Sequence, residues 1–262
     1  MKKILTLIIS GAFTLGLSLP FSASAHTVLV SSTPAAGSTI AQLPEQVILT
    51  FADPLLNLKG MAINKVQVID PMNEVITSSD NVVSGDRLSN VLSPSMVMSG
   101  PYRVIFRVSA SDGHVLNGSF TFSVGKGATT GFSITVPKTG VANFVAHANG
   151  KGVLDGPGSP TESATGKFTI NFATKSFCYL ISSNSKNITA AHVHAASQKN
   201  MSIADEIFIP LNLAAVNAKK PICEVEPGQT LAIIAKYPQR YVFMLHTKTF
   251  PDGAVAGFFT KN

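Results

Sequence analysis

The sequence predicts an all-β protein made of two domains. Val, Ile, Thr and Phe recur in short apolar runs, Gly, Pro and Ser separate these runs, and no long stretch has the period of an amphipathic helix. The 262 residues are enough for two small domains. We therefore expect an N-terminal sandwich or Greek-key β-barrel of about seven strands, followed by a second β-rich domain.

Four apolar runs mark strands of the first domain, which we place at residues 26–125. Turn signals such as Asp70-Pro71 and Asp112-Gly113 separate them, since proline and glycine favour turns. The runs are Val47–Phe51, Lys65–Ile69, Tyr102–Val108 and Ser119–Val124. The following glycine-rich segment has little apolar content, so we expect a linker at residues 126–140.

The second domain, placed at residues 141–262, repeats this pattern. Its runs are Gly166–Phe172, Phe177–Ile181, Thr189–His194, Leu231–Ala235, Tyr241–His246 and Ala254–Phe259. The residues Tyr241–Leu245 are continuously apolar, which predicts a strand buried on both faces. The segment Ile207–Lys219 is the one place where the sequence favours a short helix.

Residues 1–25 have the pattern of a cleaved secretory signal. Two lysines precede the apolar run Ile4–Leu19, and Ala23-Ser24-Ala25 is a small-residue cleavage site. An uncleaved membrane anchor is the alternative, although Pro20 breaks the helix ahead of the site. We expect export to the periplasm or beyond, a mature chain that does not span the membrane, and a free α-amino group on His26.

The charge and the cysteines fit an exported protein. Without residues 1–25 the chain has 18 basic and 14 acidic residues, an excess too small and scattered to indicate a nucleic-acid partner. Cys178 and Cys223 both lie in the second domain, where export would allow a disulfide worth roughly 3 to 4 kcal/mol. Two unrelated buried thiols are the alternative.

An N-terminal histidine is an unusual metal chelator. The α-amino nitrogen and the imidazole Nδ1 of His26 can close a six-membered ring on one ion, and Cu(II) favours such nitrogen ligands. Asp112-Gly113-His114 offers a carboxylate and an imidazole, which would share one face in extended geometry. The alternative is an ordinary hairpin turn with an exposed histidine, because Asp-Gly is a favoured hairpin turn between two apolar runs.

Residues 26–125 resemble the CopC family of exported copper-binding proteins. The matching segments are His26-Thr27-Val28-Leu29, Ser32–Gly37, Leu49-Thr50-Phe51, Gly100–Val104, Ser111–His114 and Gly118–Phe122. The resemblance implies an immunoglobulin-like Greek-key barrel or sandwich that holds Cu(II) by the amine and imidazole of His26, by Asp112 and by His114. It also implies that Asp53 is an acidic neighbour of the ligands, although an ordinary turn carboxylate before Pro54 is the alternative. A CopD-type inner-membrane copper transporter is a candidate partner.

Some CopC members carry a methionine-rich loop for Cu(I), which this chain lacks in clustered form. Met96 and Met98 come nearest, and at strand spacing they are more typical of a core than of a copper site. The sequence therefore predicts one Cu(II) site in the first domain and no separate high-affinity Cu(I) site.

Residues 141–262 resemble the CHRD domain, which implies a β-sandwich more firmly than any activity. The matching segments are Gly166–Ile170, Phe177–Leu180, Ala190–His194, Leu245-His246-Thr247 and Phe250–Gly257. His192 and His194 would face the same side of a strand, and His246 ends a strand that could lie beside it. These imidazoles could bind copper or zinc; the alternatives are a buried polar cluster or simple surface histidines. We expect His147 to lie in an exposed loop.

The first prediction for function is a non-enzymatic protein of copper resistance, homeostasis or delivery. A histidine-brace copper oxygenase is one alternative, but Asp112 would occupy the open copper position and the chain has no tryptophan to stack on a glycan. A superoxide dismutase is another, but paired copper and zinc need about six histidines and the second domain has four.

Overall fold

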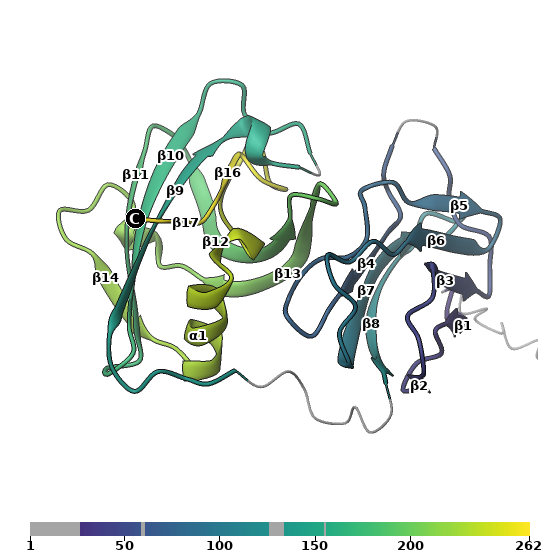
Figure 1. The fold of residues 1–262 in the computed structure, drawn as a ribbon. Coiled ribbons are helices and arrows are strands. Elements are labelled where there is room, and N and C mark those ends of the chain that lie inside the picture. The colour runs from purple at the N-terminus through teal and green to yellow at the C-terminus, as the bar shows by residue number, and fades with distance from the viewer. Residues whose placement is uncertain (1–26, 59–60, 126–133, 155) are drawn as a thin grey trace, which may run out of the picture.

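The computed structural model describes residues 27–58, 61–125, 134–154 and 156–262. His26, the predicted signal at 1–25 and much of the predicted linker therefore lie outside the described residues. The described chain is almost entirely β, as expected, and forms two halves side by side (Figure 1). None of its helices has both the length and the apolar character needed to cross a bilayer.

The N-terminal half is a sandwich of two four-stranded sheets. One sheet has the order β1-β3-β6-β5 and the other β2-β8-β7-β4, so the chain crosses between sheets three times after β3. The bounds are β1 Leu29–Thr33, β2 Thr39–Ile40, β3 Gln46–Phe51, β4 Lys65–Ile69, β5 Val82–Ser84, β6 Arg87–Val91, β7 Gly100–Ser109 and β8 Val115–Val124. The strand count exceeds the predicted seven because of the two-residue strand β2.

Alternation along β7 shows how this sandwich is built. Tyr102, Val104 and Phe106 point inward and are buried, while the residues between them are partly exposed. The ring of Phe106 lies over Gly118 on the partner strand β8, where a Cβ atom would come within 2.3 Å of the ring. Glycine at this position therefore leaves room for the Phe106 ring over the neighbouring strand.

The C-terminal half is built on one nine-stranded antiparallel sheet that curls on itself (Figure 1). Its order is β13-β12-β15-β16-β9-β10-β11-β14, with β17 also on β9. The bounds are β9 Val141–Asn149, β10 Ser163–Asn171, β11 Ser176–Ser183, β12 Ile188–Ser197, β13 Ser202–Pro210, β14 Ile222–Val225, β15 Tyr241–Thr247, β16 Val255–Phe258 and β17 Thr260–Lys261, with 3-10 turns at Gly150–Gly152, Leu213–Ala215 and Pro238–Arg240.

The helix α1, Gly228–Lys236, lies on the concave side of the curled sheet and packs against it (Figure 1). Its Leu231, Ile233 and Ile234 join the core around Phe168 and Phe243. The predicted strand Leu231–Ala235 is therefore wrong, because a short continuous apolar run has no period that separates a strand from a buried helix. The predicted helix Ile207–Lys219 is also wrong, since β13 continues to Pro210 and only a 3-10 turn follows. Tyr241–Leu245 is buried throughout, as predicted.

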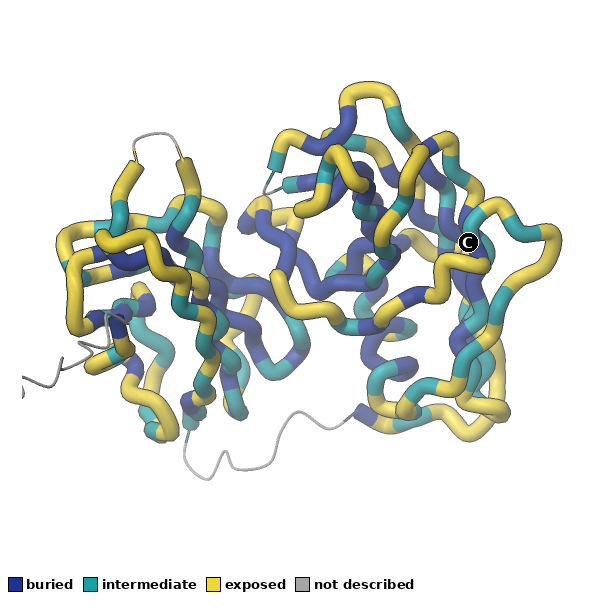
Figure 2. The backbone as a smooth tube through the Cα atoms, turned by 180° about the vertical axis from the view of Figure 1, so that it is seen from behind, coloured by how far each residue is buried: buried dark blue, intermediate teal, exposed yellow. Residues whose placement is uncertain are grey.

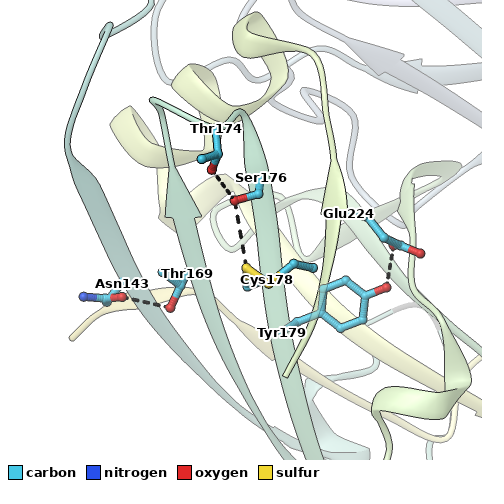
Figure 3. Close-up of a disulfide and its surroundings, with 8 residues drawn as sticks. Asn143, Thr169, Thr174, Ser176, Cys178, Tyr179 and Glu224 are labelled. Atoms are coloured by element: carbon cyan, nitrogen blue, oxygen red, sulfur yellow. Dashed lines mark hydrogen bonds between the residues drawn. A yellow bond between two sulfur atoms is a disulfide. The ribbon is translucent and has the colours of Figure 1, made fainter. Parts of the chain in front are cut away.

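The two cysteines form a disulfide that joins β11 to β14. Cys178 and Cys223 are direct cross-strand neighbours, and the bond closes a loop of 45 residues. Near them, the hydroxyl of Tyr179 donates to a carboxylate oxygen of Glu224 at 2.5 Å (Figure 3). The bond and this contact fix the edge strand β14 to the sheet.

The two halves share a buried contact between β4 and the edge strand β13 (Figure 1). Ile69, Val75, Ala195 and Ala204 form a small apolar cluster across it. Buried segments of the two halves meet there in Figure 2. The amide of Gln67 donates to the carbonyl oxygen of Ile203, and its oxygen accepts from the Asp205 backbone at 2.8 Å. The contact therefore combines apolar burial with satisfied polar groups.

Candidate metal centres

The turn between β7 and β8 brings Asp112 and His114 together. Gly113 between them has a φ of +89°, a conformation that favours glycine. Oδ2 of Asp112 lies 3.0 Å from Nδ1 of His114, and Oδ1 accepts a 2.9 Å hydrogen bond from the His114 backbone N–H. The two side chains are in contact, but their residues lie in a turn and not in the extended geometry considered from the sequence.

Both donors of this turn are accessible to an ion. The side chain of Asp112 is 37% exposed and that of His114 is 55% exposed. The hydrogen bond from the His114 backbone N–H, and then the bond from its ring, lower the pKa of Asp112 below the usual range. Asp112 is therefore a carboxylate at neutral pH. A carboxylate only accepts, so Nδ1 of His114 carries the proton that faces Oδ2 of Asp112.

Residues 52–56 connect the start of the described chain to this turn. The Asp53 backbone N–H donates to Oγ1 of the buried Thr27 at 3.2 Å. On the other side of the segment, the Ser111 backbone N–H donates to the carbonyl oxygen of Pro54 at 3.0 Å. The chain therefore enters the first half beside the segment that also holds the Asp112 turn.

The other residues considered for copper in this half lie on exposed segments. Asp53 is exposed and contacts Thr27 through its backbone. Met96 is 60% exposed, and Met98 is half-buried in the same loop between β6 and β7. The expectation of core packing is wrong for Met96, because residues 93–99 form a loop and not a strand.

Neighbouring strands bring His192, His194 and His246 together. In the register of β12 and β15, Ala190 lies opposite His246 and His192 opposite Met244, so the three imidazoles share one face. One nitrogen from each ring lies within 4.8 Å of the others. His194 is 5% exposed, and the other two are half-buried. The fold thus assembles the predicted triad.

Burial affects the protonation of this triad. It lowers the pKa of His194 to about 4, and the neighbouring ring of His192 acts in the same direction. Burial, and then the ring of His246, also lowers the pKa of His192. His147, in contrast, is exposed on β9, so the expectation of an exposed side chain is correct but the expected loop is a strand.

Backbone acceptors orient two of the rings, and the sequence did not reveal them. Nδ1 of His194 lies 2.9 Å from the carbonyl oxygen of Ala204 and 3.1 Å from that of Glu206. Nδ1 of His246 lies 2.8 Å from the carbonyl oxygen of Pro251. Every residue carries such an oxygen, so no side-chain pattern could have singled out these acceptors.

Comparison with known proteins identifies both halves. The CopC domain family matches residues 29–125, and the CHRD domain family matches residues 144–259. Copper resistance protein C of Pseudomonas syringae pv. tomato is 35% identical over 115 residues, which cover 43% of this chain and 90% of the relative. The chain belongs to the CopC family. Copper resistance protein C of Escherichia coli is 31% identical over 121 residues, covering 45% of this chain and 94% of the relative.

Two solved structures are also similar to the CopC domain. CopC from Methylosinus trichosporium OB3b is 26% identical with a TM-score of 0.31, covering 38% of this chain and 93% of that one. PcoC, a methionine-rich copper resistance protein from Escherichia coli, is 24% identical with a TM-score of 0.31, covering 38% and 99%. Asp112 and His114 lie in the part matched to CopC, and the three triad histidines lie in the CHRD domain.

Proposed function

We propose that the CopC domain binds Cu(II) through the α-amine and imidazole of His26, the carboxylate of Asp112 and the imidazole of His114. The observation that carries the proposal is the 3.0 Å contact between Asp112 and His114 in an exposed turn. Nitrogen and oxygen donors suit Cu(II), which lies at the top of the Irving–Williams order. The kinship with copper resistance proteins supports copper as the ion.

The path of the chain supports His26 as the remaining ligand. His26 directly precedes Thr27, whose hydroxyl accepts a hydrogen bond from Asp53 in the segment that also contacts Ser111. Successive Cα atoms are about 3.8 Å apart, so few places are open to a residue before a buried threonine. Asp53 would act next to the site as a neighbouring carboxylate.

In the cell, we propose that the protein works outside the cytoplasm after removal of residues 1–25. It would hold Cu(II) in the periplasm or outside the cell, for resistance or for delivery to a membrane transporter of the CopD type. This role requires binding and release but no turnover. The exposed position of Asp112 and His114 suits such exchange, because a partner can approach the ion directly.

A Cu(II) titration tests the ligand set. A His192→Ala/His246→Ala background removes the imidazole triad and leaves the CopC domain as the expected place of binding. In this background, Asp112→Ala and His114→Ala should each weaken Cu(II) binding by about tenfold or more. His147→Ala is the matched control, since it removes an exposed histidine from β9. Equal affinity in all of these proteins would contradict the proposal.

A further inference from the structure

We infer that His192, His194 and His246 form a second metal site, in the CHRD domain beside the CopC domain, that takes a late first-row divalent ion such as Zn(II) or Cu(II). The inference stands apart from the proposed copper site, because it uses none of the same residues. It rests on the orientation of two of the rings, on one unpartnered nitrogen in each of the three rings and on a pocket that His194 and His246 line.

The hydrogen bonds of two rings fix their tautomers. Carbonyl oxygens only accept, so Nδ1 of His194 must carry a proton to pair with Ala204 and Glu206. The same holds for Nδ1 of His246 and Pro251. Nε2 of each neutral ring therefore carries a lone pair. Metal-binding histidines commonly have this arrangement, with one nitrogen held by a backbone carbonyl and the other on the ion.

One nitrogen of each ring lacks a hydrogen-bond partner. Nε2 of His194, Nε2 of His246 and Nδ1 of His192 are all buried and make no hydrogen bond. Buried polar atoms are normally satisfied, so three unsatisfied nitrogens in one cluster call for an explanation. Nε2 of His194 and Nε2 of His246 are both acceptors and cannot bond to each other. One cation between the rings would satisfy all three nitrogens at once.

The donor set selects the class of ion. Three neutral imidazoles without a carboxylate or a thiolate suit zinc and copper, whereas calcium and magnesium prefer oxygen ligands. The donors lie within 4.8 Å of one another, and bonds of about 2.0–2.1 Å to one zinc ion would bring them closer together.

A pocket borders two of the three triad rings, those of His194 and His246. Its volume is about 450 Å³, and both domains line it. His194, His246 and Met244 come from the CHRD domain, while Lys65 and Arg107 come from the CopC domain. Sets of three histidines leave a fourth position on zinc for water or another ligand. The pocket supplies the space for that fourth ligand.

Metal titration of the mature chain tests the inference. An Asp112→Ala/His114→Ala background removes the proposed copper site, so failure of one site does not affect the test of the other. We expect about one equivalent of Zn(II), or of Cu(II) in a separate titration, and none of Mg(II). His246→Ala in this background should weaken binding by about 100-fold or more, while His147→Ala should leave it unchanged.

A second variant and a second measurement distinguish loss of a metal ligand from a folding defect. His192→Ala changes a half-buried ring on the other strand and should cause a similar loss. Co(II) in place of Zn(II) should give the visible absorption of a low-symmetry nitrogen site, which both variants abolish while their circular dichroism stays that of the parent. No binding in the background protein, or equal binding by His246→Ala and His147→Ala, would overturn the inference.

Discussion

Nδ1 of His194 lies 2.9 Å from the carbonyl oxygen of Ala204, at a bulge where residues 204–206 of β13 face a single residue of β12. The side chains of the same bulge reach the CopC domain. Asp205 pairs with Lys65 at 2.7 Å, and Glu206 pairs with Arg103 at 2.8 Å. One short segment therefore orients a triad ring and docks the neighbouring domain.

Replacing His194 should destabilise the protein even without metal. His194→Ala removes a buried ring and leaves the carbonyl oxygens of Ala204 and Glu206 without this donor. We expect the free energy of unfolding to fall by about 2 to 4 kcal/mol, measured by urea denaturation. His147→Ala should change it by less than about 0.5 kcal/mol. A loss below about 1 kcal/mol for His194→Ala would show that the ring contributes little to the stability of the fold.

The contact between the domains can be tested at two neighbouring residues. The buried amide of Asn200 donates to the carbonyl oxygens of Val75 at 2.8 Å and Ser93 at 3.1 Å. Asn200→Ala should therefore lower the free energy of unfolding by about 1 to 3 kcal/mol. Lys199 donates to Pro94 from an exposed position, so Lys199→Ala should cost less than about 1 kcal/mol. Equal effects in urea unfolding would mean that the domains do not dock this way.

Asp70 should make stability depend on pH. Burial raises its pKa from 3.8 to about 6, although two backbone N–H groups and Arg240 of the CHRD domain oppose the shift. The folded state therefore holds the proton more tightly than the unfolded state. The resulting stabilisation is complete below about pH 4 and is lost as the pH rises through about 6.

The variant Asp70→Asn isolates this effect. Relative to the variant, the wild type should gain about 3 kcal/mol of unfolding free energy as the pH falls from 7 to 4. Urea denaturation of both proteins at several pH values measures the difference. A difference that stays constant, or that shrinks as the pH falls, would show that Asp70 is not protonated in the folded protein.

Local signals in the sequence were enough to predict much of the fold. The run Lys65–Ile69 coincides with β4, because Asp-Pro follows it and marks its end. The Asp112-Gly113 turn and its flanking runs predict the β7–β8 hairpin. The prediction of a strand at Leu231–Ala235 was wrong for a physical reason. This segment is buried as part of α1, and that burial depends on the curl of a sheet formed by distant segments. The local sequence pattern does not predict that curl.

The candidate sites could be predicted only as sets of side chains. The two-residue spacing of His192 and His194 indicates a shared face, and the register of β15 adds His246. The tautomers depend on carbonyl oxygens that any residue would supply, so they needed the structure. The buried contact between the domains was also hidden, because Gln67 and Asn200 look like ordinary surface residues in the sequence.

Copper titration against a change at the N-terminus tests the central claim most directly. Mass spectrometry first determines the N-terminal residue of the exported protein. Its Cu(II) affinity is then compared with that of a form carrying one extra residue before His26. Both proteins carry His192→Ala/His246→Ala. We predict a mature chain that starts at His26, and a loss of at least about tenfold in affinity when its amine is displaced. A different N-terminus, or the same affinity in both forms, would contradict the account.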